Sequence, residues 1–370
     1  HADRSPYQCL SVHAGNPRFI SFVQLEAWGW LPRTAGLVPA NGGVRQALLA
    51  QAREIFLTQG GAPEMEAFDA AHAFWLEDYA LYVALRQEHA HRAWWQWPEP
   101  VRDRAPAALA EARSRHADDL ALVRFEQFVF FRQWHELRRA AQTRGVQLFG
   151  DLPIFVAHDS ADVWAQRDYF DLDAAGQPRV VAGVPPDYFS PTGQRWGNPL
   201  YNWTHLQADG FRWWIERLRT QFDLFDLVRI DHFRGFEACW QIPADEATAI
   251  NGCWMPAPGE ALFQALQNEF GTLPVVAEDL GLITPAVHLL REQFGFPGMR
   301  ILQFAFDGGA DNPYLPHNHE VNSVVYTGTH DNNTTLAWFE SLSVEQQYSV
   351  LDYLGHPGEP MPWPLMRAAF

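Results

Sequence analysis

The stretch that decides the fold reads Phe222-Asp-Leu-Phe-Asp-Leu-Val-Arg-Ile-Asp-His-Phe-Arg234. Its apolar residues are typical of a buried β-strand, yet this strand ends in a carboxylate, Asp231, between two arginines and a histidine. Charged side chains at the carboxyl end of a buried strand are typical of chemistry at the mouth of a sheet or barrel. The pattern therefore predicts an inward-facing strand that carries a functional group at its end.

The same design recurs twice along the chain. Pro274–Gly281 reads Pro-Val-Val-Ala-Glu-Asp-Leu-Gly, and Ser323–Asn332 reads Ser-Val-Val-Tyr-Thr-Gly-Thr-His-Asp-Asn. These two apolar strands end in Glu278 and Asp331. Further elements are expected between and around them, with strands at about 146–156 and 299–306 and helices at about 205–222, 260–270 and 284–295. Strands that alternate with helices predict a parallel sheet in an α/β fold.

Polar clusters at the ends of several strands favour a closed (β/α)8 TIM-type barrel over an open, doubly wound sheet. No glycine-rich phosphate loop follows the early strands, which argues further against a dinucleotide-binding fold. Residues 1–370 are therefore interpreted as a single catalytic barrel domain. Segment 44–144 is predicted to be a mainly helical insertion, because apolar residues recur at helical spacing and Gly145 follows as a stop signal.

A loop rich in proline, glycine and aspartate is expected from about 171 to 202. Within it, segment 183–200 is predicted to be an active-site lid, because long loops inside compact domains are usually functional. It carries the aromatic residues Tyr188, Phe189 and Trp196. The alternative is a packed connector whose aromatic side chains point inward.

The composition limits the classes of partner. Net charge is −17, which argues against nucleic acid or an anionic membrane and favours a neutral substrate. No uninterrupted apolar run of about 18 residues exists, so no membrane-spanning segment is expected. Aromatic residues make up 14% of the chain and include 16 tryptophans, and such side chains suit the faces of sugar rings. The three cysteines lack zinc or disulfide spacing, which indicates a reducing, cytoplasmic compartment.

The three acids suit glycoside chemistry, which needs two carboxyl groups in different protonation states. Asp231 is the candidate nucleophile; Arg229 lies on the same strand face and is expected to lower its pKa. Glu278 is the candidate acid/base, because apolar neighbours and nearby carboxylates raise a pKa. Asp331, beside His330, is expected to stabilise an oxocarbenium-like transition state.

Other interpretations of these residues stay open. The acids can instead be structural ion pairs or helix caps. Two clusters of histidines and acids, Glu88–His91 and His317–Glu320, resemble metal sites but lack zincin spacing, so no metal is expected. A serine hydrolase is disfavoured because no Gly-x-Ser-x-Gly elbow is present.

Several long motifs together resemble the amylomaltase family, the 4-α-glucanotransferases or disproportionating enzymes of glycoside hydrolase family 77. The resemblance covers essentially the whole chain and keeps the family's order of motifs. The matching stretches are Ser5–Gln8, Ala14–Pro17, Gly150–Trp164, Gly183–Tyr201, Arg229–Gly235, Ala277–Gly281 and Gly328–Asn332.

This resemblance implies a (β/α)8 barrel with helical insertions, no cofactor, and transfer of α-1,4-glucan segments to the 4-hydroxyl of an acceptor sugar. It implies Asp231 as nucleophile, Glu278 as acid/base and Asp331 as transition-state stabiliser, with maltodextrin donors and acceptors as partners. It also implies a set of substrate contacts, among which Tyr7 stacks beneath the donor sugar. These contacts are Ser5, Tyr7, Asp151, Asp187, Tyr188, Phe189, Trp196, Arg229, His330 and Asn332.

The chain also departs from the family. Its relatives begin well before the Ser-Pro-Tyr-Gln motif and continue past Phe370, so this chain is expected to be an interior piece that lacks a barrel strand at each end. Arg4 stands where many members carry an aspartate. A hydrolase that uses the same acids and an inactive glucan-binding fragment are the two alternative functions.

Overall fold

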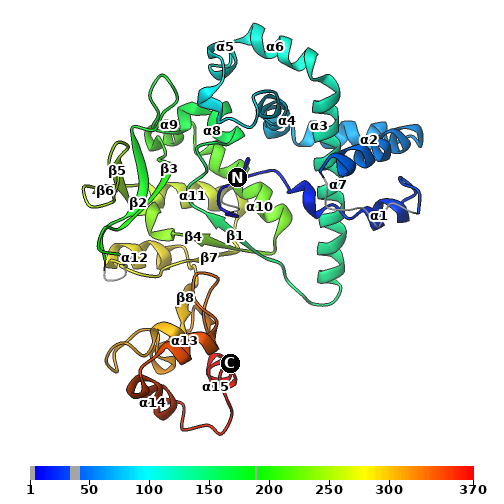
Figure 1. The fold of residues 1–370 in the computed structure, drawn as a ribbon. Coiled ribbons are helices and arrows are strands. Elements are labelled where there is room, and N and C mark those ends of the chain that lie inside the picture. The colour runs from blue at the N-terminus through cyan, green and yellow to red at the C-terminus, as the bar shows by residue number, and fades with distance from the viewer. Residues whose placement is uncertain (1–4, 34–41, 188–189) are drawn as a thin grey trace.

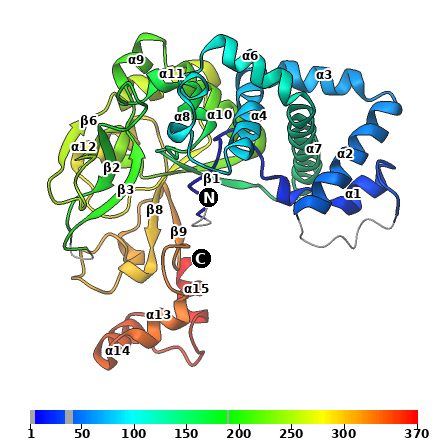
Figure 2. The ribbon, with the colours of Figure 1, turned by 45° about the horizontal axis from the view of Figure 1, so that its top comes forward.

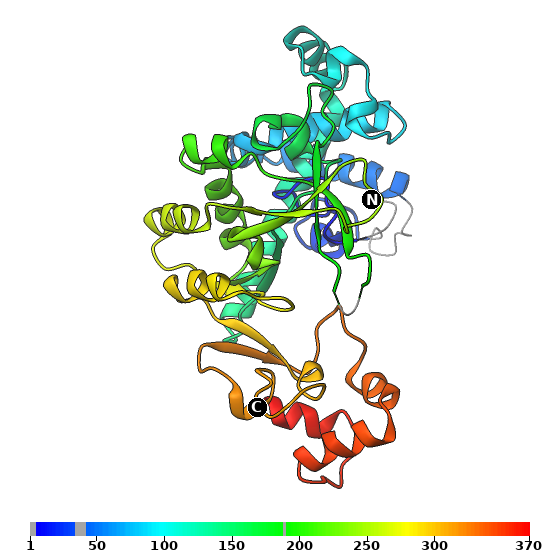
Figure 3. The ribbon, with the colours of Figure 1, turned by 90° about the vertical axis from the view of Figure 1, so that its left-hand side faces the viewer.

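A computed structural model describes residues 5–33, 42–187 and 190–370 of the chain. Figure 1 shows three regions: helices on one side, a central region with two sheets, and a C-terminal region built on β8 and β9. The C-terminal region projects from the central sheet, as the view in Figure 3 also shows. The architecture is α/β, with helices packed around short strands.

The central parallel sheet contains β1 (Phe149–Pro153), β4 (Leu227–Asp231) and β7 (Val275–Ala277) in the order β1-β4-β7. In this register Pro153 pairs with Asp231 and Ile230 pairs with Ala277. The carboxyl ends of the three strands are therefore level, so the residues that follow them emerge at one edge. This sheet contains three of the strands expected from the apolar runs.

A second parallel pair joins β8 (Gly298–Ile301) to β9 (Ser323–Tyr326). It lies next to β7, because the amide of Ala277 donates a 2.9 Å hydrogen bond to the carbonyl of Pro297. The strands follow one another in the chain order β1, β4, β7, β8, β9. No further parallel strand is found in the described ranges 5–33, 42–187 and 190–370.

One part of the core lies between the central sheet and helices α10 (Arg212–Leu224) and α11 (Gly259–Phe270). Val228 and Phe263, from a strand and a helix, are fully buried members of the same cluster. Strands covered on both faces are rich in apolar residues, which explains the apolar runs of the sequence. Helix α12 (Pro285–Gln293) follows β7 and leads into β8.

Helices fill the segment 44–144, for which the sequence predicts them. The longest is α7 (Ala117–Gln142), and the aromatic rings of Phe125 and Phe128 pack with those of Trp30 and Phe56. Figure 2 shows α2, α3 and α7 on the side of the molecule away from β2 and β3. The helices of this segment are α2 (Gly42–Thr58), α3 (Ala62–Ala71), α4 (Ala73–Glu88), α5 (Glu99–Arg102), α6 (Pro106–Arg115) and α7.

The prediction of a loop from 171 to 202 is wrong in part, because this segment contains two antiparallel strands. They belong to a four-stranded sheet in the order β3-β2-β5-β6, built from β2 (Val180–Val184), β3 (Gln194–Pro199), β5 (Ala238–Pro243) and β6 (Cys253–Pro256). Their glycines and prolines hide the strand signal, and β6 is exposed along its whole length, so it lacks the apolar alternation that marks a strand.

The helix expected at 205–222 is two helices. α9 (Trp203–Ala208) ends before Gly210, and α10 starts after it; Gly210 and Phe211 both have positive φ angles, 73° and 60°. A left-handed turn of this kind ends a helix, and glycine adopts it without steric cost. The remaining helices are α1 (Phe22–Ala27), α8 (Ala161–Ala165), α13 (Thr335–Ser341), α14 (Val344–Tyr353) and α15 (Trp363–Ala369).

Within the described part of the chain, no helix is both long enough and apolar enough to cross a lipid bilayer.

Candidate active site

A cleft of about 1100 Å³ opens at the carboxyl ends of the parallel strands. Its walls come from distant parts of the chain: Tyr7 from the N-terminal segment, Asp231 and Glu278 from the central sheet, and Asp331 and Asn332 from the loop after β9. The three acids expected to act together therefore line a single cavity. The cleft has room for a ligand and gathers the three predicted acids, which makes it the candidate site.

Arg229 organises one wall of the cleft. Its guanidinium is buried; Nη1 lies 2.7 Å from Oδ1 of Asp151 and Nη2 lies 2.7 Å from Oδ1 of Asp231. Asp151 faces Arg229 across the β1–β4 pairing. The arginine thus fixes the rotamers of two carboxylates at once, which is the use of a planar guanidinium fork.

Tyr7 ties the N-terminal segment to the same wall. Its hydroxyl donates to Oδ2 of Asp151 at 2.8 Å and lies 2.6 Å from Nε2 of His330. Because the single hydroxyl proton goes to Asp151, Nε2 of His330 is the donor in the second contact. Burial, followed by the charge of Asp151, raises the pKa of Tyr7, so its hydroxyl stays protonated. The chain end near Ser5 and the loop after β9 meet at this point.

Asp231 has a raised pKa, not the lowered one expected from the sequence. Burial is the largest cause, and the neighbouring guanidinium of Arg229 opposes it without overcoming it. The prediction was wrong because an ion pair two residues away is visible in sequence, whereas the loss of water around the carboxylate is not. The 2.7 Å contact with Arg229 still favours the ionised form of Asp231.

Glu278 is held by main-chain amides at the end of β7. Its Oε2 accepts from the amide of His232 at 2.8 Å, and Oε1 accepts from the amide of Leu280 at 2.9 Å. Burial and then the charge of Asp231 raise the pKa of Glu278 to about 7. Asp231 therefore loses its proton first, and its charge then retains the proton on Glu278. That split is the one an acid and a nucleophile need.

The amide of His232 points at Glu278 because His232 is in the left-handed region, with φ 56°. Its imidazole is buried and lines the cleft, and burial lowers its pKa to about 3. The ring is therefore neutral near pH 7. Histidine tolerates this backbone better than most residues, and the buried surroundings hold it there.

The predicted role of Glu278 as acid/base implies a pH dependence. A general acid must be protonated, and the pKa of Glu278 lies at about 7, so this prediction expects kcat/KM to fall as pH rises through that value, by about tenfold per pH unit in the limit. Initial rates at low donor concentration across pH 5–9, with stability checked at each pH, measure this. Glu278→Gln should lose most activity, and its remaining activity should no longer fall as pH rises. If that fall persists in the variant, it arises from the titration of another group.

Asp331 and Asn332, two further predicted site residues, differ in exposure and in hydrogen bonding. Asp331 is exposed, with Oδ2 3.5 Å from Nε2 of His330. Asn332 lines the cleft, but its Oδ1 accepts from the amide and the hydroxyl of Thr329 at 2.8 and 3.0 Å. The side chain of Asn332 thus shapes the loop that presents Asp331.

The predicted lid is only partly described. Trp196 lies on β3 at the cleft, with its ring edge-on to His232 at 4.8 Å between centroids. Asp187 also lines the cleft, and its Oδ1 accepts from the amide of Ser190 at 2.7 Å. Tyr188 and Phe189 fall outside the described residues. Ser5 lines the cleft as well, and its hydroxyl accepts from the amide of Tyr7 at 3.3 Å.

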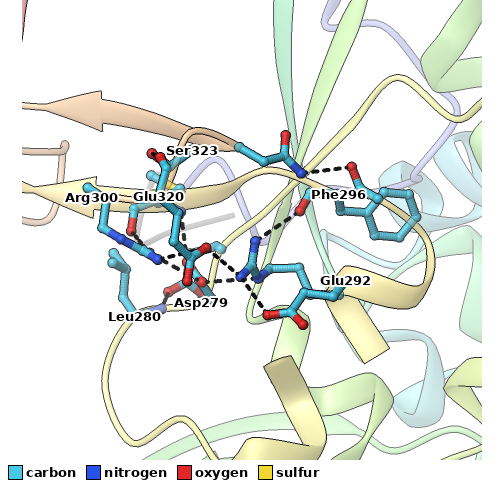
Figure 4. A network of polar contacts seen from close by, with 12 residues as sticks. Asp279, Leu280, Glu292, Phe296, Arg300, Glu320 and Ser323 are labelled. Carbon is cyan, nitrogen blue, oxygen red and sulfur yellow. Dashed lines mark hydrogen bonds and ion pairs between the residues drawn. The ribbon is translucent and has the colours of Figure 1, made fainter. Parts of the chain in front are cut away.

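A buried ion network is centred on Asp279, the residue after Glu278 (Figure 4). Asp279 accepts from the amide of Met299 at 2.7 Å and pairs with Nε of Arg291 at 3.5 Å and with Nη1 of Arg300 at 3.4 Å. Both arginines also contact Glu320, at 2.9 and 3.3 Å. The network joins the segment directly after β7, which contains Glu278 and Asp279, to β8, α12 and the segment before β9. Sequence reasoning missed it, although alternation along the strand puts Asp279 on the face opposite Glu278.

Gly298 allows the carboxylate of Asp279 to lie close to the backbone of β8. A Cβ at this position would lie 2.4 Å from an oxygen of Asp279. Any larger residue would push the carboxylate away from β8, so glycine is required here by contact and not by its backbone angle.

In the described residues, no group of three or more His, Cys, Asp or Glu side chains is placed to hold a metal ion. Cys9, Cys239 and Cys253 are free thiols.

The fold and the cleft define a class: an α/β enzyme with paired acids at the ends of parallel strands, the arrangement of glycoside-processing enzymes. The chain belongs to the 4-α-glucanotransferase family of glycoside hydrolase family 77, whose model matches residues 1–370. This finding confirms the resemblance drawn from the motifs, and the chain is accordingly an enzyme with 4-α-glucanotransferase activity.

Individual relatives agree with this assignment. The chain is 50% identical to a 4-α-glucanotransferase of Thermus thermophilus and 46% identical to one of Synechocystis. These matches cover 98% and 99% of this chain and 76% of each relative. Among solved structures, an amylomaltase from Streptococcus agalactiae in complex with acarbose superposes with a TM-score of 0.93 at 35% identity, covering 98% of this chain and 77% of that one.

Proposed function

We propose that the enzyme transfers α-1,4-glucan segments to the 4-hydroxyl of an acceptor glucan or glucose through a covalent glucosyl ester on Asp231. The observation that carries this proposal is the pair of acids at one cleft: Asp231 held by Arg229, and Glu278 with a pKa of about 7. One acid is ready to attack as a carboxylate and the other is ready to give a proton.

In the first step, a carboxylate oxygen of Asp231 forms a bond to the anomeric carbon while the bond from that carbon to the glycosidic oxygen breaks. Glu278 gives its proton to the departing oxygen, which leaves as the free 4-hydroxyl of the shortened chain. In the second step, Glu278 takes the proton of an acceptor 4-hydroxyl, whose oxygen attacks the anomeric carbon and releases Asp231. Two inversions retain the α configuration.

Other cleft residues are proposed to support the donor sugar. Asp331 and His330 stabilise the positive charge that develops at the ring, and Tyr7, fixed by Asp151, supports its lower face. Asp187, Trp196 and the remaining predicted contacts (Ser5, Tyr188, Phe189, Arg229 and Asn332) complete the substrate-binding set. Maltodextrins are the partners of this proposal, and no cofactor takes part.

Transfer in preference to hydrolysis requires that a sugar reaches the glucosyl ester before water does. Segment 183–200, which joins the end of β2 to β3 and contributes Trp196 to the cleft, is proposed as the lid that excludes water on the acceptor side. The lid role rests on the position of this hairpin beside the acids.

The finer fold assignment is also a proposal. We infer that β1, β4, β7, β8 and β9 are successive strands of a (β/α)8 barrel, because they are parallel and follow chain order, and because the acids at or after the ends of β4, β7 and β9 line one cleft. The helices of 44–144 are then an insertion in a single catalytic domain, 1–370. The expectations that the chain is an interior piece of that barrel, and that the enzyme works in the cytoplasm, stay predictions.

Incubation with maltotriose tests the function. Transfer should give glucose together with maltotetraose and longer oligosaccharides, because each glucosyl ester is passed to another sugar. Thin-layer or anion-exchange chromatography over a time course separates these products. A hydrolase that uses the same acids would give only glucose and maltose, and a glucan-binding scaffold would leave maltotriose intact; either result would reject the proposal.

A further inference from the structure

One side of the cleft carries an aromatic side chain that the mechanism does not use. Trp254, on β6, lines the cleft and is 36% exposed. The guanidinium of Arg234 lies over its ring, 3.7 Å from the centroid, and the ring of Trp240 lies 5.2 Å away at 65°. A large aromatic ring held by its neighbours yet open to a cleft is a surface for a ligand, not part of the core.

Arg234 is unusually placed for an arginine. It belongs to the 3-10 helix η5 (Phe233–Phe236), directly after the Asp231 strand, and is only 7% exposed. Its Nη1 donates to the carbonyl of Leu282, and its Nε is buried with no hydrogen-bond partner among the described residues. Burial lowers the pKa of this guanidinium. A buried, incompletely partnered donor that lines a cleft is suited to a ligand that brings an acceptor.

The position of this pair relative to the acids indicates which sugar it meets. Glu278 protonates the departing oxygen, so the leaving chain, and later the acceptor, occupy the side of the cleft beside Glu278. The chain continues from Glu278 through Leu280 to Leu282, and these residues line the cleft up to the point where Leu282 contacts Arg234. The proposed donor contacts Tyr7, Asp151 and His330 instead form a hydrogen-bonded group, which Arg229 joins to Asp231 through its ion pairs with Asp151 and Asp231.

We propose that Trp254, stacked on Arg234, is an acceptor-side platform that binds an α-1,4-glucan beyond its first sugar unit. The apolar face of a glucose ring stacks on the indole, and a hydroxyl oxygen of the sugar accepts from the guanidinium. Arg234 also holds the indole in a fixed orientation, which reduces the ordering cost of binding. The platform therefore selects for acceptor length. This inference rests on the proposed function and names the ligand of that same cleft.

Trp254→Ala tests the platform, with α-maltosyl fluoride as a common donor and either glucose or maltopentaose as acceptor. The KM for maltopentaose should rise roughly tenfold, because one stacking contact is lost, while the KM for glucose stays within about twofold. Trp254→Phe should restore most of the affinity, because a flat ring remains. Trp363→Ala is the matched control, since Trp363 is exposed on α15 and is not among the residues lining the cleft.

Equal changes in KM for both acceptors, or no change for maltopentaose, would overturn the platform. Binding measured without turnover provides a second readout: calorimetry of maltoheptaose with Asp231→Asn should give a higher affinity than with Asp231→Asn/Trp254→Ala. The two proposals fail separately. Transfer that persists in Asp231→Asn rejects the catalytic assignment, whereas equal maltoheptaose affinity in both variants rejects only the platform.

Discussion

Asp231→Asn should lower the rate of glucan transfer by about 10⁴-fold or more, because an amide cannot form the glucosyl ester. The protein should stay folded, since the amide oxygen can still accept from Nη2 of Arg229, which lies 2.7 Å from Oδ1 of Asp231 in the parent. Product formation from maltotriose measures the loss. The pKa of Glu278 should also fall below about 7, because the charge of Asp231 contributes to raising it; a carbon-13 NMR titration of labelled glutamate reports this shift.

The control for this change is Asp118→Asn, the same substitution at an exposed acid in the first turn of α7. It should match the parent in rate and in melting temperature. A direct test of the ester uses Glu278→Gln with α-maltosyl fluoride, whose leaving group needs no protonation. Mass spectrometry of the denatured protein should then show one added maltosyl group on the peptide that contains Asp231. Transfer activity retained in Asp231→Asn, or a label on another peptide, would contradict the assignment.

Asp279→Asn should lower the free energy of unfolding by about 3–5 kcal/mol, because it leaves two buried arginines without their buried counter-charge. The side chains of Asp279 and Arg291 are each 1% exposed, and that of Arg300 is 6% exposed, so water cannot replace the lost carboxylate. Urea unfolding followed by tryptophan fluorescence measures the change. Activity should fall as well, since the network joins the strand of Glu278 to the β8–β9 pair, beyond which Asp331 lies.

Glu320→Gln is the matched comparison for the network. Glu320 pairs with the same two arginines, but its side chain is 48% exposed, so its loss should cost no more than about 1 kcal/mol. The difference between the two variants in the free energy of unfolding separates the effect of burial from the effect of ion pairing. If Glu320→Gln destabilises the protein as much as Asp279→Asn does, the buried position of Asp279 has no special weight, and burial is not the cause of the loss in stability.

The proposed catalytic acids could be found from sequence because each stands at or shortly after the end of an apolar strand. Asp231, Glu278 and Asp331 stand within motifs in which a short apolar run meets a charged cluster, and parallel strands bring such ends together. The order and direction of the parallel strands also followed from the alternation of strands and helices. These are features that a local pattern carries by itself.

Other features depend on contacts that no local pattern records. The raised pKa of Asp231 comes from burial, and the network around Asp279 joins residues from four separate segments of the chain. The strands β2, β3, β5 and β6 escaped prediction because they are short and interrupted by glycine and proline, and they gain their stability from pairing with one another. The sequence did not mark Trp254 as a site residue, because the folded structure determines whether a tryptophan side chain lines a cleft.

The main-chain hold on Glu278 has a consequence for how this active site can evolve. The amides of His232, the left-handed residue after the proposed nucleophile, and of Leu280 donate to Glu278 at 2.8 and 2.9 Å, so the backbone sets the position of the proposed proton donor relative to Asp231. Substitutions that alter neighbouring side chains leave those peptide units in place. The stereochemical outcome can thus be inherited through the backbone trace, while the walls of the cavity diverge to accept different chains.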